Sequence, residues 1–190
     1  MSPPTRLSAL QRLIAAAGLA AALAFVASAA FAASASEITS NGRAALQRLY
    51  ASSSGAQALG GKASAVLVFP EIVKAGLMIG GLGGEGVMLV KGKPVGYYRI
   101  AAATYGLQAG AQKYSYALFF MTPSSVNYLS QSKGWSIGSG PSVVVMDEGK
   151  AKAMNSTTMT QDVYAFPFGQ KGLMAGMGLE GSKITPIQPK

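Results

Sequence analysis

The side chains available for catalysis are few, because the 190-residue chain contains no His and no Cys. Without imidazole or thiol groups, Ser-His-Asp and Cys-His nucleophile systems are excluded, as are zinc, haem and iron–sulfur sites that depend on these ligands. Disulfide bonds are excluded for the same reason. Only carboxylate, Lys, Ser/Thr and Tyr side chains remain for chemistry, and we expect neither a cofactor nor a metal site.

Three patterns match catalytic or nucleotide-binding motifs only in part. Glu71 and Glu85 supply two carboxylates for acid/base catalysis, but nothing in the sequence fixes their separation. Ser130–Lys133 satisfies S-x-x-K without the S-D-N and K-T-G motifs of that enzyme class. Gly81–Gly86 reads G-x-G-x-x-G, yet no acidic residue follows at the distance that ribose binding needs. We therefore predict that the protein is not an enzyme, with a hydrolase that uses Glu71 or Glu85 as an alternative.

The net positive charge of the chain favours a role in binding an anionic partner. Sixteen Lys and Arg residues against seven Asp and Glu give a formal net charge of +9, and no acidic residue occurs between Glu85 and Asp147. A segment with charges of one sign favours an anionic partner, although an ordinary solvated surface is the alternative. Aromatic residues from Tyr97 to Trp135 alternate with the basic ones, as they do at lipid headgroups. The basic residues of the acid-free segment are Lys91, Lys93, Arg99, Lys113 and Lys133.

The first residues have the pattern of an export signal. A start with two arginines leads into the uncharged stretch Leu13–Ala35, and Ala30-Phe31-Ala32 supplies the small-x-small pattern of a cleavage site. We predict a signal peptide over residues 1–32 and one domain over residues 33–190, with a retained membrane anchor as the alternative. Cleavage would lower the formal charge from +9 to +7. Export implies a periplasmic or secreted protein, associated peripherally with the membrane, for which nucleic acid is not an expected partner.

Two helices and a series of short strands are expected to position these residues. Helical periodicity runs from Ser40 to about Ser54, and Gly60-Gly61 is expected to stop the helix. Thr122 and Pro123 have the types preferred at the N-cap and first position of a second helix. Lys91–Pro94 is expected to form a hairpin turn. The β-like runs cover residues 65–69 (closed by Pro70), 76–81, 86–90, 95–103, 106–112, 114–120, 142–146, 162–168, 173–179 and 183–187.

These patterns predict an α+β fold, in which mainly antiparallel strands form a curved sheet or barrel with a few short helices packed on it. The sequence Gly-Leu-x-x-Gly occurs three times, at Gly76–Gly80, Gly106–Gly110 and Gly172–Gly176. In a strand, the two glycines of each repeat lie on the same face. They leave a stripe almost free of side chains, where another backbone, a bulky ring or a ligand can approach closely.

Several ordered blocks of the sequence together resemble the SYLF, or Ysc84-like, domain family. The resemblance extends from about Arg43 to Ile187, and it implies a non-enzymatic module that binds anionic lipids, including phosphoinositides. Actin binding, which is a property of yeast-type members, is not expected here because a signal peptide replaces their basic N-terminal extension. The blocks are AVLVFP at residues 65–70, GLMIGGLGGEGVMLV at 76–90, YGLQAG at 105–110, Gly140-Pro141 and the closing segment 164–184.

We therefore predict that the protein binds anionic phospholipids or phosphoinositide-like headgroups at the cell envelope. The alternative is a structural envelope protein that binds a protein or a polysaccharide through its glycine-rich strands. No oligomeric state is predicted. The expected lipid contacts are Arg43 and Arg48 on the first helix, Lys91 and Lys93 at the hairpin turn, and Arg99 on the strand that follows.

Overall fold

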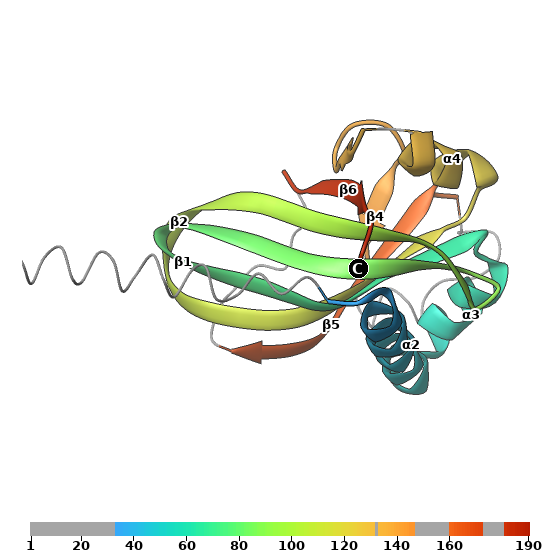
Figure 1. Ribbon diagram of the computed structural model, residues 1–190, viewed down its shortest axis with the longest axis horizontal. Helices are drawn as coiled ribbons and strands as arrows, with labels where there is room; N and C mark the ends of the chain where they lie inside the picture. The colour runs from blue at the N-terminus through green and yellow to red at the C-terminus, as the bar shows by residue number, and fades with distance from the viewer. Residues whose placement is uncertain (1–32, 132, 147–159, 173–180) are drawn as a thin grey trace, which may run out of the picture. The chain divides into compact units, whose positions relative to one another are not determined.

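The computed structural model describes residues 33–131, 133–146, 160–172 and 181–190. The predicted signal peptide, the predicted strand at 173–179 and most of the third glycine repeat lie outside these residues. The helices and strands, in chain order, are α2 (Ala35–Ser52), α3 (Ser54–Lys62), β1 (Ala65–Val90), β2 (Lys93–Phe120), α4 (Pro123–Gln131), β3 (Trp135–Ser136), β4 (Val143–Val145), β5 (Val163–Gly172) and β6 (Lys183–Ile187) (Figure 1).

The strands form one six-stranded sheet organised around β2. One edge of β2 pairs with β1 along most of its length, while the other edge pairs with β6 near its beginning and with β5 near its end. The outer strands are β3, beside β6, and β4, beside β5. Every described pairing is antiparallel except that of β4 with β5. The predicted α+β fold with a curved, mainly antiparallel sheet is confirmed (Figure 1).

The short β-like runs of the sequence are segments of two long strands. The run at 65–69 does not end at Pro70, because β1 continues through the proline to Val90. The strand register is irregular between Phe69 and Ile72. A proline has no N–H to donate to a neighbouring strand, and an irregularity in the ladder is where a sheet tolerates it. The hairpin turn predicted at Lys91–Pro94 is confirmed, but it is confined to Lys91 and Gly92, whose φ angles are positive at 49° and 75°, because β2 already begins at Lys93.

The β1–β2 hairpin doubles back, so that the second half of β1 packs against its first half. A Cβ atom built on Gly84 would lie 2.5 Å from the carbonyl oxygen of Glu71, and one on Gly86 would lie 2.5 Å from that of Val68. At Gly80, in the first glycine repeat, a Cβ atom would overlap the carbonyl oxygen of Ala75. Only glycine allows these approaches. The expectation that a backbone approaches the glycine stripe is confirmed at Gly80, and that backbone belongs to the same strand.

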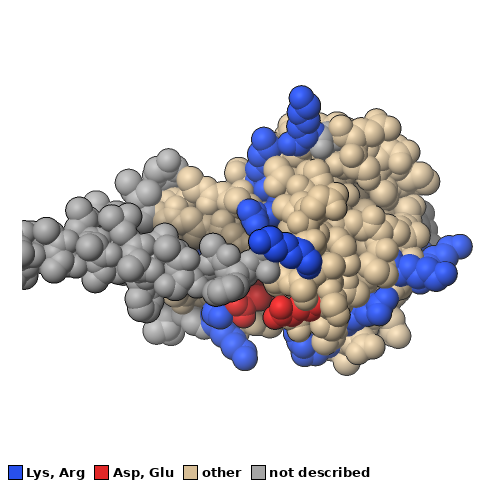
Figure 2. Space-filling model, in the orientation of Figure 1, with Lys and Arg blue, Asp and Glu red and all other residues tan. Residues whose placement is uncertain are grey.

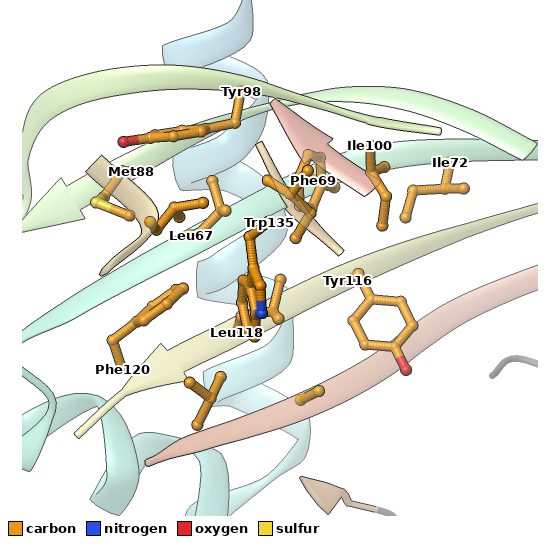
Figure 3. Close-up of a cluster of buried hydrophobic side chains, with 14 of the residues drawn as sticks. Leu67, Phe69, Ile72, Met88, Tyr98, Ile100, Tyr116, Leu118, Phe120 and Trp135 are labelled. Atoms are coloured by element: carbon orange, nitrogen blue, oxygen red, sulfur yellow. The ribbon is translucent and has the colours of Figure 1, made fainter. Parts of the chain in front are cut away.

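Both faces of the central strands are buried. Leu67 and Phe69 point into the folded hairpin, where they join an inner core with Trp135 (Figure 3). Val66 and Val68 alternate with them and point to the opposite face, where α2 and α3 cover an outer core. Burial on both faces explains why this part of the sequence is continuously hydrophobic rather than alternating.

The first helix begins earlier than predicted and is followed directly by another. Ser34 caps α2 by accepting a hydrogen bond from the backbone N–H of Glu37 at 3.2 Å, so the helix starts at Ala35 rather than Ser40. The break in the helical segment occurs at Ser53, whose Oγ caps α3. The prediction that Gly60-Gly61 stops the helix is wrong, because both glycines lie inside α3. Packing of the fully buried Leu59 outweighs the low helix propensity of glycine.

The second predicted helix is confirmed as α4. The Oγ1 of Thr122 accepts a hydrogen bond from the backbone N–H of Ser125 at 3.2 Å, and Pro123 is the first helical residue. Among the helices within the described residues, none has the length and apolar character needed to cross a membrane.

Candidate anion-binding site

A pocket of about 680 Å³ lies at the surface where α2, β1, β2 and β5 meet. Each of three elements contributes one basic side chain to its lining: Arg48 comes from α2, Lys113 from β2 and Lys171 from β5. Among the residues that the structure describes, Glu71 of β1 is the one acidic residue in the lining. A smaller hollow of about 360 Å³ shares Arg48 and Glu71 with this pocket and is also lined by Asn41 of α2. We call the larger hollow the basic pocket.

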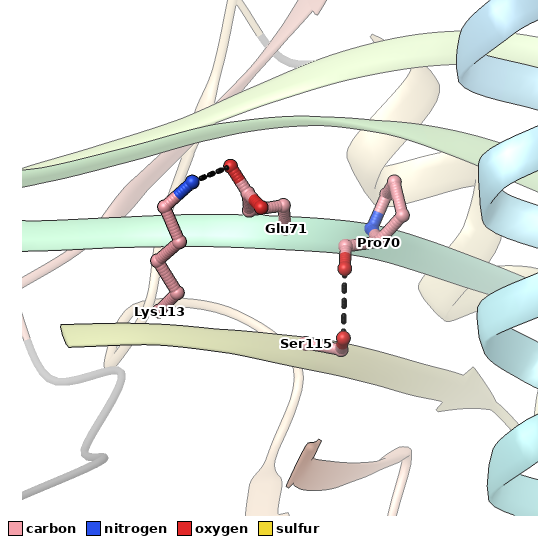
Figure 4. Close-up of polar contacts among 4 residues, drawn as sticks. All are labelled: Pro70, Glu71, Lys113 and Ser115. Carbon is pink, nitrogen blue, oxygen red and sulfur yellow. Dashed lines mark hydrogen bonds and ion pairs between the residues drawn. The ribbon is translucent and has the colours of Figure 1, made fainter. Parts of the chain in front are cut away.

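The strand register places two lysines of the basic pocket opposite each other. Lys113 and Lys171 are cross-strand partners of β2 and β5, and both are exposed. Like charges in this arrangement repel, which destabilises the pair unless an anion compensates. The carboxylate of Glu71 lies 2.9 Å from the Nζ of Lys113 (Figure 4). Both side chains of this ion pair are more than half exposed, so water and salt screen it and a stronger anion can compete for Lys113.

Two cations of the basic pocket have no ion pair among the described residues. Arg48 is exposed on α2, beside the buried Leu49 that anchors the helix to the sheet. Lys171 is exposed near the end of β5. The fork of N–H donors on a guanidinium group matches the oxygen atoms of a phosphate, while a lysine ammonium acts as a point charge. The arrangement therefore suits a phosphate or carboxylate group that bridges the three elements.

A hydrogen bond fixes the floor of the basic pocket. The Oγ of Ser115 donates to the carbonyl oxygen of Pro70 at 2.7 Å, which ties β2 to β1 where the register is irregular (Figure 4). This bond holds Glu71, the next residue of β1, beside Lys113. No group of three or more His, Cys, Asp or Glu residues that could hold a metal occurs in the described part of the chain.

The five predicted lipid contacts fall in three places. Arg48 alone lies in the basic pocket. Arg43 donates a hydrogen bond from its Nη2 to the carbonyl oxygen of Gly92 at 2.9 Å, which brings it to the hairpin turn, where Lys91 and Lys93 lie on either side of Gly92. Arg43, Lys91 and Lys93 therefore form a second basic group, at the place where α2 contacts the hairpin turn.

Arg99 lies in neither group. Its Nη2 is 2.7 Å from the Oε1 of Glu85, its cross-strand partner on β1. The side chain of Glu85 is only 20% exposed, and its carboxylate already neutralises Arg99. Both carboxylates that the sequence suggested for acid/base catalysis, Glu71 and Glu85, therefore form ion pairs with basic residues.

Basic side chains are spread over the molecular surface. On the face that Figure 2 shows, Lys and Arg project from several separate places, whereas the acidic side chains form one small group. Charge alone therefore does not single out a site on this face, and the basic pocket is distinguished by its concave shape and by the convergence of three elements.

Sequence reasoning missed two residues of the basic pocket. Lys113 belongs to the acid-free segment, so its charge was visible, but no local pattern set it apart from other lysines of that segment. Lys171 lies outside the acid-free segment, and only the pairing of β5 with β2 brings it to Lys113.

A comparison with protein families agrees with the resemblance over residues 101–189, which is part of the predicted extent from about Arg43 to Ile187. The family model Ysc84, described as "Las17-binding protein actin regulator", matches residues 101–189. This region contains most of β2 together with α4 and all later strands, including Lys113 and Lys171. No curated protein matches the chain. Residues 101–189 therefore belong to the Ysc84, or SYLF, family.

Proposed function

We propose that this protein binds anionic phospholipid or phosphoinositide-like headgroups at the cell envelope, without catalysing a reaction, and that the basic pocket is the headgroup site. The observation that carries the proposal is the convergence of Arg48, Lys113 and Lys171 on one hollow, whose described lining contains a single acidic residue. Such a hollow attracts a phosphate group by charge and offers donors from three directions. The matching family is described as one of binding proteins, which also supports a binding role.

The proposed setting is outside the cytoplasm. A signal peptide over residues 1–32 would deliver the protein to the periplasm or the exterior, where it would associate peripherally with anionic membrane lipids. The family description names Las17 and actin. We do not extend those partners to an exported protein.

Co-sedimentation with lipid vesicles tests the proposal. Wild-type protein should sediment with phosphatidylcholine vesicles that contain phosphatidylglycerol, and not with phosphatidylcholine alone. The double variant Lys113→Ala/Lys171→Ala should lose most of this binding, since both cations point into the pocket. The double variant Lys133→Ala/Lys183→Ala removes the same charge from exposed positions elsewhere and should bind nearly as the wild type does.

The hairpin turn provides the competing site in the same experiment. If Lys91→Ala/Lys93→Ala abolishes vesicle binding while Lys113→Ala/Lys171→Ala leaves it intact, the headgroup site is the second basic group and not the basic pocket. Equal binding to neutral and anionic vesicles, or no binding to either, would contradict lipid-headgroup recognition altogether.

One observation favours a structural role with a protein or polysaccharide partner as the second candidate. Among the described strands, β4 lies at an edge of the sheet, and its Val145 is an exposed apolar residue. An open edge can accept an added strand from another chain. Such binding would be insensitive to salt and indifferent to lipid.

A further inference from the structure

Helix α2 lies on the outer core with one side buried and the opposite side exposed. The buried side consists of apolar residues and one glycine: Ile38, Gly42, Ala45, Leu46 and Leu49. The exposed side consists of uncharged residues: Ser40, Ala44, Gln47 and Ala51. We call these four exposed residues the crest of α2. Glu37, the one acidic residue of α2, lies before the crest in the first turn of the helix.

The two arginines of α2 flank the crest on opposite sides. Five residues of an α-helix correspond to about 140° around the helix axis and about 7.5 Å along it, and this is the separation of Arg43 and Arg48. Arg43 is on the side of the hairpin turn, where it donates a hydrogen bond to the carbonyl oxygen of Gly92. Arg48 is on the other side, where it lines the basic pocket. Helix α2 therefore lies between the two basic groups, and its crest separates them.

Two contacts near Arg43 hold α2 against the sheet. A Cβ atom built on Gly42 would lie 2.5 Å from the Cγ1 of Val87, so the absence of a side chain lets the helix approach β1 closely. The hydroxyl groups of Thr39 and Tyr97 form a hydrogen bond of 2.9 Å, which ties the start of the helix to β2. The helix cannot rotate about its axis without breaking these contacts. The direction in which the crest faces is therefore fixed relative to both basic groups.

The charges beside the crest favour an anionic surface. The second basic group supplies three cations, and the basic pocket supplies three more against Glu71. Helix α4, by contrast, packs on the inner core and contains no charged residue. Lys133 follows α4, and Lys183 lies against the neighbouring Gly134. Figure 1 shows α2 and α4 on opposite sides of the sheet. A flat layer of negative charge is therefore attracted most strongly to the side that bears α2.

We infer that the protein lies on an anionic membrane with the crest of α2 against the lipid surface, so that the second basic group and the basic pocket each contact a headgroup of the same bilayer. The uncharged crest lets the helix come close to the headgroups, while the cations on its two flanks reach them. Once one group has bound, the other binds from a high effective concentration, which strengthens the association without any further contact. This inference rests on the proposed function, and it adds the orientation and the second contact.

Fluorescence of singly labelled protein tests the orientation. The chain contains no Cys, so a single introduced cysteine is labelled specifically. Gln47→Cys places an environment-sensitive nitrobenzoxadiazole label on the crest, and Asn127→Cys places the same label on the exposed side of α4. With phosphatidylcholine vesicles that contain phosphatidylglycerol, a nitroxide on the lipid headgroups should quench the label at position 47 strongly. The label at position 127 should be quenched little, although both labelled proteins co-sediment with the vesicles.

Two pairs of substitutions test the double contact. Lys91→Asn/Lys93→Gln removes the lysines of the second basic group, and asparagine tolerates the positive φ angle of 49° at position 91. This variant and Lys113→Ala/Lys171→Ala should each weaken vesicle binding by roughly 10- to 30-fold, the effect expected for two lysines at an anionic membrane surface. Thermal unfolding monitored by circular dichroism confirms that each variant is folded.

Lys133→Ala/Lys183→Ala is the matched control, because it removes the same charge near α4. It should bind vesicles nearly as the wild type does. The inferred orientation is overturned if the label on α4 is quenched as strongly as the label on the crest, or if neither is quenched while the protein co-sediments. The double contact is overturned if Lys91→Asn/Lys93→Gln binds as the wild type does. Failure of the proposed function would instead appear as absent co-sedimentation of the wild type, or as full binding by Lys113→Ala/Lys171→Ala.

Discussion

Tyr116 shows how burial sets the ionisation of a single residue in this fold. Its side chain is fully buried in the inner core, and burial raises its pKa, to which the charge of the neighbouring Tyr114 adds. The unfolded chain has an ordinary tyrosine pKa near 10, so the folded state binds this proton more tightly. The resulting contribution to stability is fully present below pH 10 and is lost as the pH rises further.

A change at Tyr116 should therefore alter the alkaline limit of stability. The melting temperature of the wild type should fall as the pH is raised above 10, and Tyr116→Phe should flatten this fall because it removes one buried group that must ionise. Thermal unfolding monitored by circular dichroism at a series of pH values measures the slope. Tyr128→Phe, which removes an exposed hydroxyl, is the control and should keep the wild-type slope. An unchanged slope in Tyr116→Phe would show that other groups set the alkaline limit.

At the scale of elements, the doubling back of β1 depends on glycines at particular positions. Gly84 lies against the backbone of Glu71, where an added methyl group has no room and a carbonyl oxygen cannot move aside easily. Gly83 is adjacent in sequence but points the other way, and its nearest neighbour, the carbonyl oxygen of Ile100, would be 3.8 Å from a Cβ atom. The two glycines differ in packing and not in local sequence.

This pair of neighbours gives a direct test of the folded hairpin. Gly84→Ala should lower the free energy of unfolding by about 1–3 kcal/mol, as overpacking does in other cores. Gly83→Ala should be neutral or slightly stabilising, because alanine restricts the unfolded chain more than glycine does. Urea denaturation of both variants measures the difference. Similar losses at both positions would contradict the close approach of the two halves of β1.

Elements were predictable from sequence where the signal is local, and not where it depends on pairing. The turn at Lys91-Gly92 and the cap at Thr122 depend on a few adjacent residues, and both predictions are confirmed. The single strand that spans Pro70 depends on β2 alongside it, and the helix through Gly60-Gly61 depends on packing of Leu59. Neither cause is visible in a short stretch of sequence.

The residues of the basic pocket also divide into those that the sequence alone could suggest and those that only strand pairing identifies. The charge of Arg48 was enough to nominate it, and it lines the basic pocket. Lys171 became a candidate only through its register with Lys113, since residues far apart in the chain meet there.

At the scale of the whole molecule, a formal charge of +9 acts on any anionic surface through water. The basic residues in the described part of the chain are mostly exposed. Exposed charges are screened over about 10 Å at 0.1 M salt and over about 3 Å at 1 M. The proposed membrane association therefore depends on ionic strength in a way that an apolar contact does not.

Vesicle binding should accordingly weaken steeply as salt is added. Co-sedimentation with vesicles containing phosphatidylglycerol, measured at rising sodium chloride concentration, should show progressive release of the wild-type protein. The variant Lys113→Ala/Lys171→Ala should show a shallower salt dependence, since it has fewer cations to be screened. Binding that is unaffected by salt would contradict an electrostatic headgroup contact and favour a protein or polysaccharide partner.

The nested pairing of β1 with β2 also bears on how the chain reaches its folded state. The pairs run from Val90 with Lys93, next to the turn, out to Ala65 with Phe120. Each cross-strand pair that forms shortens the loop that the next pair must close. The hairpin can therefore form pair by pair, from the turn towards the strand ends, at a small entropic cost for each pair. The contacts of β5 and β6 close longer loops and are therefore slower to form. During synthesis, the β1–β2 hairpin that forms one side of the inner core would thus be able to pair before β5, with Lys171, and β6, with Ile184, have been synthesised.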